Sequence, residues 1–90
     1  MVISKPYSDK KIGDFLIRSF SSDVPEHELV WHRDTSFRLI TLALGENWKL
    51  QFDNELPFEL NPGIWHSVQP NVFHRLIKGT TPLIILIKQF

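Results

Sequence analysis

Residues 61–74 have the sequence Asn-Pro-Gly-Ile-Trp-His-Ser-Val-Gln-Pro-Asn-Val-Phe-His, in which short turns and short strands alternate. The Pro62-Gly63 pair favours a type II turn, and Pro70-Asn71 predicts a second turn. Each turn is followed by a run of about five residues that is apolar or alternating, which predicts a strand. Because turns this short cannot hold a parallel crossover, we expect neighbouring strands to be antiparallel.

The same pattern continues on both sides of this stretch. Eight strands are predicted, at Gly13–Phe20, Glu28–His32, Phe37–Leu44, Trp48–Phe52, Pro57–Leu60, Ile64–Val68, Phe73–Ile77 and Leu83–Ile87. The third and fourth are expected to form a hairpin around Gly45-Glu46-Asn47. One short helical turn is predicted near residues 23–29, where Asp23 or Ser22 can cap its start. The predicted fold class is therefore all-β, an antiparallel sandwich or barrel.

Length and composition limit the domain organisation. The chain has 90 residues, of which 42% are hydrophobic and 22% charged, as is ordinary for a globular domain. A chain of this length fits a single domain, 1–90, and excludes an enzyme with separate cofactor and substrate domains.

Charge and cysteine content exclude several classes of function. Ten basic residues balance ten acidic ones, so we expect neither nucleic acid nor a membrane surface as a partner. Because there is no cysteine, disulfides, thiolate nucleophiles and cysteine-ligated metals are excluded. Residues 1–6 lack the apolar core of a signal peptide, and no apolar run approaches the ~18 residues that span a bilayer. We therefore expect a cytoplasmic protein.

The run Leu83-Ile84-Ile85-Leu86-Ile87 is apolar on both of its faces. Such a strand is either central in the sheet arrangement of one chain or covered by a second copy of the protein. The first alternative predicts a buried core strand and the second a homodimer, and periodicity does not separate them. Trp48 lies on a strand whose alternation puts it on one face with Leu50 and Phe52, where it fills the barrel, lines a pocket or contacts a partner copy.

Three side chains have a spacing that suits metal binding. If residues 31–34 are extended, His32 and Asp34 project from the same face because they are two residues apart. With His74 from another strand they would supply two imidazoles and one carboxylate, which can hold a divalent transition metal with open positions. The alternative is that these histidines are ordinary hydrogen-bonded or surface residues.

The polar residues stand in two ordered groups: His32, Asp34, Arg38 and Gly45, then Pro62-Gly63, Pro70-Asn71 and His74. These groups resemble the two sequence motifs of a small single-domain cupin, a double-stranded β-helix or jelly-roll barrel. The resemblance covers roughly two-thirds of the chain, from about residue 32 onward. It implies an antiparallel jelly-roll that brings His32, Asp34, Arg38 and His74 around one pocket.

The first motif is altered in this sequence. Cupin metal sites generally use two histidines and a glutamate from the first motif and a histidine from the second, whereas here Asp34 replaces the second histidine and Arg38 replaces the glutamate. Arginine has no lone pair to offer a metal and repels one unless it turns away or pairs with Asp34. The resemblance therefore leaves two hypotheses for the pocket.

In the favoured hypothesis the protein binds a small anionic or polar ligand without a metal, and His32, Asp34, Arg38, His74 and Trp48 contribute to the pocket. In the alternative, His32, Asp34 and His74 hold Fe, Mn, Ni or Zn in an enzyme of the isomerase or dioxygenase type that acts on a small metabolite. A third hypothesis is a protein-interaction module in which the polar residues are the remains of a cupin site. Whether the protein is an enzyme stays open between these hypotheses.

Overall fold

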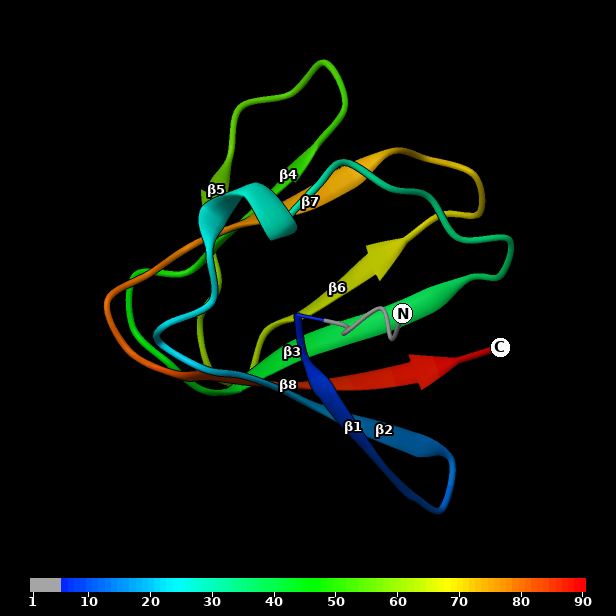
Figure 1. The fold of residues 1–90 in the computed structure, drawn as a ribbon. Coiled ribbons are helices and arrows are strands. Elements are labelled where there is room, and N and C mark those ends of the chain that lie inside the picture. The colour runs from blue at the N-terminus through cyan, green and yellow to red at the C-terminus, as the bar shows by residue number, and fades with distance from the viewer. Residues whose placement is uncertain (1–5) are drawn as a thin grey trace, which may run out of the picture.

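The computed structural model describes residues 6–90 and confirms the all-β class. The remaining residues, 1–5, include most of the segment on which the signal-peptide expectation was based. Within the described part there are eight strands and one 3-10 turn, shown in Figure 1. They are β1 (Ser8–Ile12), β2 (Phe15–Phe20), η1 (Glu26–Glu28), β3 (Arg38–Leu44), β4 (Lys49–Phe52), β5 (Phe58–Glu59), β6 (Trp65–Val68), β7 (His74–Ile77) and β8 (Leu83–Gln89).

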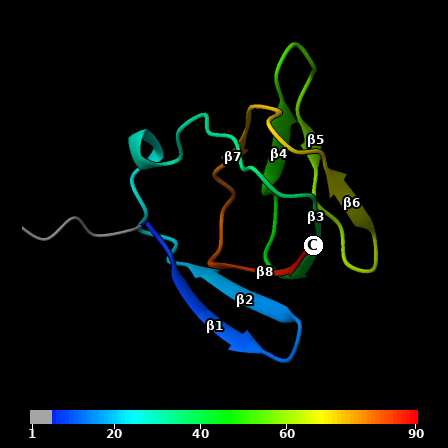
Figure 2. The same ribbon diagram turned by 90° about the vertical axis from the view of Figure 1, so that its right-hand side faces the viewer.

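The strands form two antiparallel sheets, as in a jelly-roll. One sheet has five strands in the order β1-β2-β8-β3-β6, and the other has three in the order β5-β4-β7. In Figure 1 the three-stranded sheet lies above the five-stranded one, and Figure 2 shows the same arrangement from the side. Most pairs join strands that are distant in the chain, such as β2 with β8 and β3 with β6. Segments far apart in sequence are thereby brought to one space between the sheets.

The core lies between the two sheets and takes residues from both. On β8 the side chains of Leu83, Ile85 and Ile87 are buried, and they pack with Leu50 of β4. Trp48 belongs to this core: it is 1% exposed, and its indole Nε1 donates a hydrogen bond of 2.7 Å to the carbonyl of Thr81. Burial of these side chains supplies the main driving force for closing one sheet over the other.

At the N-terminal side one predicted strand was wrong, and one strand was not predicted. The segment Glu28–His32 is not a strand; it ends the η1 turn and runs irregularly until His32 forms an isolated bridge with His74. The strand β1 was not predicted because its five residues are all exposed and show no apolar alternation. It pairs with β2 across a tight turn in which Gly13 takes a positive φ of 57°. The helical turn expected near residues 23–29 is present as η1, but the predicted cap by Asp23 or Ser22 was wrong, because Pro25 is the N-cap residue and no side chain caps the turn.

The predicted hairpin between residues 37–44 and 48–52 was also wrong. β3 pairs with β6 and β8, whereas β4 pairs with β5 and β7 in the other sheet. The chain crosses between the sheets at Gly45–Asn47 instead of folding back. The physical reason is burial: Trp48 and Leu50 gain more by facing the core from the opposite sheet than by lying beside β3.

β8 is a central strand of the five-stranded sheet, between β2 and β3. Its alternate residues Leu83, Ile85 and Ile87 are buried, whereas Ile84 and Leu86 on the opposite face are only partly covered. The apolar run is therefore explained on its inner face by the core of one chain. Among residues 6–90 there is no helix with the length and apolar character needed to cross a bilayer.

Candidate functional site

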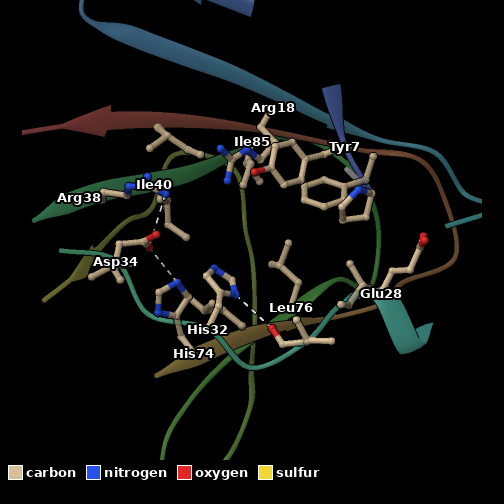
Figure 3. A pocket seen from close by; sticks show the side chains of 17 residues that line it. Tyr7, Arg18, Glu28, His32, Asp34, Arg38, Ile40, His74, Leu76 and Ile85 are labelled. Carbon is tan, nitrogen blue, oxygen red and sulfur yellow. Dashed lines mark hydrogen bonds and ion pairs between the residues drawn. The ribbon is translucent and has the colours of Figure 1, made fainter. Parts of the chain in front are cut away.

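A cavity of about 350 Å³ lies between the sheets, and most of its wall is apolar. Both sheets contribute to that wall: β3 and β8 provide Ile40, Ile85 and Ile87, and β4 and β7 provide Leu50 and Leu76. The polar lining includes His32, Asp34, Arg38 and His74, and also Tyr7, Arg18 and Glu28 (Figure 3). Trp48 does not line this cavity. Its ring is committed to the core, so the expected role in the pocket wall is not supported by its position.

The two histidines are joined through their backbones. His32 N donates to the carbonyl of His74 at 3.0 Å, and His74 N donates to the carbonyl of His32 at 2.9 Å. This bridge puts the ring centroids 4.3 Å apart in an edge-on arrangement. His74 begins β7 and is 7% exposed, whereas His32 lies at the exposed mouth of the site. Two residues that are distant in sequence therefore form one pair.

Both histidine rings are held in the same tautomer. His32 Nδ1 lies 3.0 Å from the carbonyl of Val30, and His74 Nδ1 lies 2.9 Å from the carbonyl of Val72. Because a carbonyl oxygen only accepts, each Nδ1 must carry the proton. In the neutral rings the lone pair is therefore on Nε2, which is free to accept a proton or bind a metal. Tying Nδ1 to a carbonyl is also how proteins orient histidine ligands of metals.

Asp34 lies between Arg38 and His74, as Figure 3 shows. Its Oδ2 atom is 3.4 Å from Arg38 Nη1 and 3.3 Å from His74 Nε2. Neither contact has hydrogen-bond geometry, so this buried oxygen has no hydrogen-bond partner within residues 6–90. The backbone of this loop is anchored because Asn71 N donates to the carbonyl of Asp34 at 2.7 Å. The turn at Pro70-Asn71 thus places the carboxylate beside His74.

A proton or a metal ion would stabilise the contact between Asp34 Oδ2 and His74 Nε2. Burial lowers the pKa of His74 and favours its neutral ring, and nearby His32 and Arg38 act in the same direction, while the Val72 carbonyl and Asp34 oppose them. With the proton on Nδ1, a neutral ring turns its Nε2 lone pair toward the lone pairs of the carboxylate. That arrangement is repulsive unless Nε2 becomes protonated or a metal ion lies between the two atoms.

Arg38 projects from β3 into the same space. Its Nη2 donates to Gln89 Oε1 at 3.2 Å, but its Nε is buried and has no hydrogen-bond partner in the described chain. The side chain is only 16% exposed. Since a guanidinium has five N–H donors and burial without acceptors is costly, this group is able to bind a further anion.

Arg18 is a second arginine in the cavity that the sequence analysis did not single out. It projects from β2 and forms a bidentate pair with Asp9, at 2.8 Å from Nε to Oδ1 and 2.9 Å from Nη2 to Oδ2. Its guanidinium lies 3.8 Å from the centroid of the Tyr7 ring. In Figure 3, Arg18 and Tyr7 lie across the cavity from the histidines. The strand pattern holds a signal for Arg18, because alternation puts it on the inward face with Leu16 and Phe20.

Comparison with solved structures identifies the fold. A cupin-2 domain protein from Shewanella frigidimarina superposes with a TM-score of 0.66 at 16% identity, covering 98% of this chain and 85% of the other. The chain folds as a small cupin-type domain. A protein from Neisseria meningitidis matches with a TM-score of 0.64 at 15% identity, over 100% of this chain and 89% of the other. A proposed mannose-6-phosphate isomerase from Ralstonia eutropha matches with a TM-score of 0.62 at 16% identity, over 92% and 81%. No protein-family profile and no curated protein matches the sequence.

The cupin-type barrel holds a group that is able to bind a metal ion. One ligand atom from each of His32, Asp34 and His74 lies within 4.8 Å of the others. The two Nε2 lone pairs and Asp34 Oδ2, which has no hydrogen-bond partner in the described part of the chain, fit a divalent cation, since these are the donor types such ions take. Arg38 opposes this, because its Nη1 is 3.4 Å from the same carboxylate oxygen. A metal there would have to share Asp34 with the guanidinium.

Proposed function

We propose that this cupin-type protein binds a small organic anion, with the anionic group at Arg38 and an apolar body along the cavity wall. The observation that carries the proposal is the half-buried guanidinium of Arg38, whose Nε is fully buried. Its nearest carboxylate is 3.4 Å away and poorly aligned, and its Nε has no hydrogen-bond partner among residues 6–90. A ligand carboxylate would satisfy these donors with charge-assisted hydrogen bonds.

The rest of the cavity indicates the kind of ligand. A volume of about 350 Å³ lies at the small end of the usual range for ligand sites, ~300–1,000 Å³. The wall beside Arg38 is formed by Ile40, Ile87 and Val68, so a carboxylate ligand with an apolar or aromatic body is favoured over a sugar. Arg18 has both Nε and Nη2 committed to Asp9, which makes it a weaker anion site than Arg38.

Calorimetric titration tests the proposal. The probes are benzoate and hexanoate, and their neutral amides serve as matched controls. We expect the carboxylates to bind and the amides to bind at least about tenfold more weakly, since a hydrogen bond to a charged group contributes roughly 1.5–3 kcal/mol. Arg38→Gln should weaken carboxylate binding about 10–100-fold for the same reason. Arg33→Gln is the control variant, because Arg33 lies over the Phe73 ring and does not line the cavity. Equal affinity of wild type and Arg38→Gln would refute the role of Arg38.

The converging His32, Asp34 and His74 atoms favour a second candidate, a divalent-metal-dependent enzyme of the isomerase or dioxygenase type. A bound metal would act as a Lewis acid that polarises an oxygen of the ligand, or as a redox centre. In that case Arg38 orients the anionic end of the substrate, the apolar wall excludes water, and the carbonyls of Val30 and Val72 keep both Nε2 atoms directed at the site.

Metal analysis distinguishes the two candidates. The protein is purified without chelator and its Fe, Mn, Ni and Zn content is measured. A near-stoichiometric metal that is lost in His74→Ala but kept in His27→Ala would support the metal enzyme, because His27 is exposed on η1, away from the site. Metal content below about a tenth of stoichiometric, with no binding of added Zn²⁺ or Mn²⁺ at micromolar concentration, would support the metal-free pocket.

A further inference from the structure

Arg18 brings a second guanidinium into the cavity, at a different place from Arg38. The register of β2 with β8 pairs Arg18 with Ile85, whose side chain is buried and lines the cavity. Because paired residues of an antiparallel sheet project to the same face, Arg18 also points inward. Its side chain is only 12% exposed. Among the described residues the cavity wall therefore has two guanidinium groups, and the proposed function uses one of them.

The two arginines are separated by an apolar stretch of the cavity wall. Arg18 pairs with Ile85 of β8, and Arg38 pairs with Gln89 of the same strand. Ile85 and Gln89 are four residues apart, which is about 13 Å of extended strand. Ile85 and Ile87, at the start and in the middle of this stretch, both line the cavity. A ligand with its anionic group at Arg38 would therefore lay its body along the isoleucines in the direction of Arg18.

The charge of Arg18 is already compensated. Asp9 accepts hydrogen bonds from both Nε and Nη2, and the guanidinium lies 3.8 Å from the centroid of the Tyr7 ring. Burial acts to lower the pKa of Arg18, but the hydrogen bond with Asp9 and the negative charge nearby outweigh it, so this pKa is raised. Arg18 thus stays a cation and is held in place by a carboxylate and an aromatic ring.

Arg18 still has hydrogen-bond donors to offer. A guanidinium carries five N–H groups, and the pair with Asp9 uses one on Nε and one on Nη2. Nη1 donates no hydrogen bond to any residue from 6 to 90. Figure 3 shows that the side chain extends into the cavity, across from the histidines. Because Asp9 already balances the positive charge, these donors suit a neutral acceptor, such as a carbonyl oxygen, better than a second anion.

We propose that Arg18 is a specificity residue, which selects those small carboxylates whose far end carries a neutral hydrogen-bond acceptor. This inference rests on the proposed function, because the carboxylate of the same ligand is placed at Arg38. The ligand is then a small oxo acid, with a carboxylate at one end, an apolar stretch in the middle and a carbonyl oxygen at the other end. An apolar far end would exclude water from the Arg18 donors without replacing its hydrogen bonds, at a cost in affinity.

Calorimetric titration with matched pairs of acids tests this selection. The pairs are 4-oxopentanoate with pentanoate, 5-oxohexanoate with hexanoate, and 6-oxoheptanoate with heptanoate. Adipate is added because it carries a second negative charge at its far end. We expect at least one oxo acid to bind about fivefold or more tightly than its matched acid. Adipate should bind no more tightly than 5-oxohexanoate, because Asp9 already compensates the charge of Arg18.

The variant Arg18→Lys separates the planar fork of donors from the charge. Lysine is able to keep the ion pair with Asp9, but it is a point charge on a flexible stem, so the preference for the oxo acid should fall below about twofold. Arg33→Lys is the matched control and should keep the preference, because Arg33 does not line the cavity. Circular dichroism checks that each variant is folded. The comparison of acids on wild type stays decisive if Arg18→Lys does not fold.

Three results would overturn the inference: no oxo acid that binds more than about twofold tighter than its matched acid, a preference that folded Arg18→Lys retains, or adipate binding about tenfold tighter than 5-oxohexanoate. In each case carboxylate binding that is weakened in Arg38→Gln leaves the proposed function standing. If no carboxylate binds at all, the proposed function fails, and the neutral ketone 2-hexanone then tests Arg18 by NMR. A shift of the Arg18 side-chain signals at millimolar ketone would support the acceptor site, and unchanged signals would refute it.

Discussion

The substitution Asp34→Asn separates the two candidate functions because they predict effects of opposite sign. In the anion-binding pocket, Asp34 competes with the ligand for Arg38 and repels the incoming carboxylate. Removing its charge should therefore tighten binding of benzoate or hexanoate. In the metal site, Asp34 is a ligand, and its loss should weaken metal binding by at least about tenfold.

The expected magnitude follows from the distances. Asp34 Oδ2 is 3.4 Å from Arg38 Nη1, so a ligand carboxylate on the other side of the guanidinium would be about 6 Å from Asp34. At an effective dielectric constant of roughly 40, suited to a site at the mouth of a cavity, two like charges at that separation repel by about 1–2 kcal/mol. This corresponds to roughly 5–30-fold tighter binding in Asp34→Asn.

Calorimetry at pH 7.5 and low salt measures this change, and added salt should reduce it. Asp53→Asn is the control, since Asp53 lies in the exposed turn after β4 and does not line the cavity. Unchanged or weaker carboxylate binding in Asp34→Asn would refute the view that Asp34 competes for Arg38. A loss of bound metal in the same variant would instead favour the metal enzyme.

Three further predictions concern stability, each measured by urea unfolding. Burial lowers the pKa of folded His74 below its ordinary value of 6.5, so the unfolded chain takes up a proton first as the pH falls. The free energy of unfolding should therefore decrease below about pH 6.5, and it should decrease less in His74→Gln. Equal pH slopes for the two proteins would contradict this prediction. Leu83→Ala should lower the free energy of unfolding by about 3–5 kcal/mol, because Leu83 is 0% exposed. Leu56→Ala is the control and should lower it by less than about 0.5 kcal/mol, because Leu56 is 88% exposed. Similar losses in the two variants would count against the assigned core. Gly79→Ala should lower the free energy of unfolding by at least about 2 kcal/mol, because a Cβ there would lie 2.7 Å from Trp48 N and meet the Glu46 carbonyl. An unchanged urea midpoint would show that the chain is not tightly packed at Gly79.

Most strand positions could be predicted from local sequence. Alternation and turn residues locate strands because side-chain direction and backbone turn preferences act within a few residues. The exceptions have clear causes. β1 is wholly exposed and carries no apolar signal, and Glu28–His32 has suitable residues but no neighbouring strand with which to pair continuously. β3 and β4 belong to different sheets because their side chains are buried from opposite sides of the core. The sequence rules for hairpins consider only the turn and its neighbouring residues, so they do not predict this.

The candidate site was only partly open to prediction. The spacing of His32 and Asp34 and the order of the motifs indicated which residues would lie together. The structure puts one ligand atom of each within 4.8 Å of a ligand atom of His74. Arg18 was missed because a single charged residue on an apolar strand face has many explanations before its partners are known. Trp48 was predicted to contribute to the pocket because aromatic residues suit both a core and a ligand contact. In the structure its Nε1 donates a hydrogen bond to the Thr81 carbonyl, and the ring lies in the core.

The amino-acid order by itself determined the all-β class, the turns and the supply of two imidazoles, one carboxylate and one guanidinium, because those properties reside in short stretches of chain and in side-chain chemistry. Tertiary structure alone decided that Arg38 has a buried Nε without a hydrogen-bond partner among residues 6–90, that Asp34 lies between Arg38 and His74, and that the apolar run of β8 is buried on one face and partly exposed on the other. These are consequences of which strands pair over long separations, and pairing is selected by the burial of the whole core rather than by any local signal.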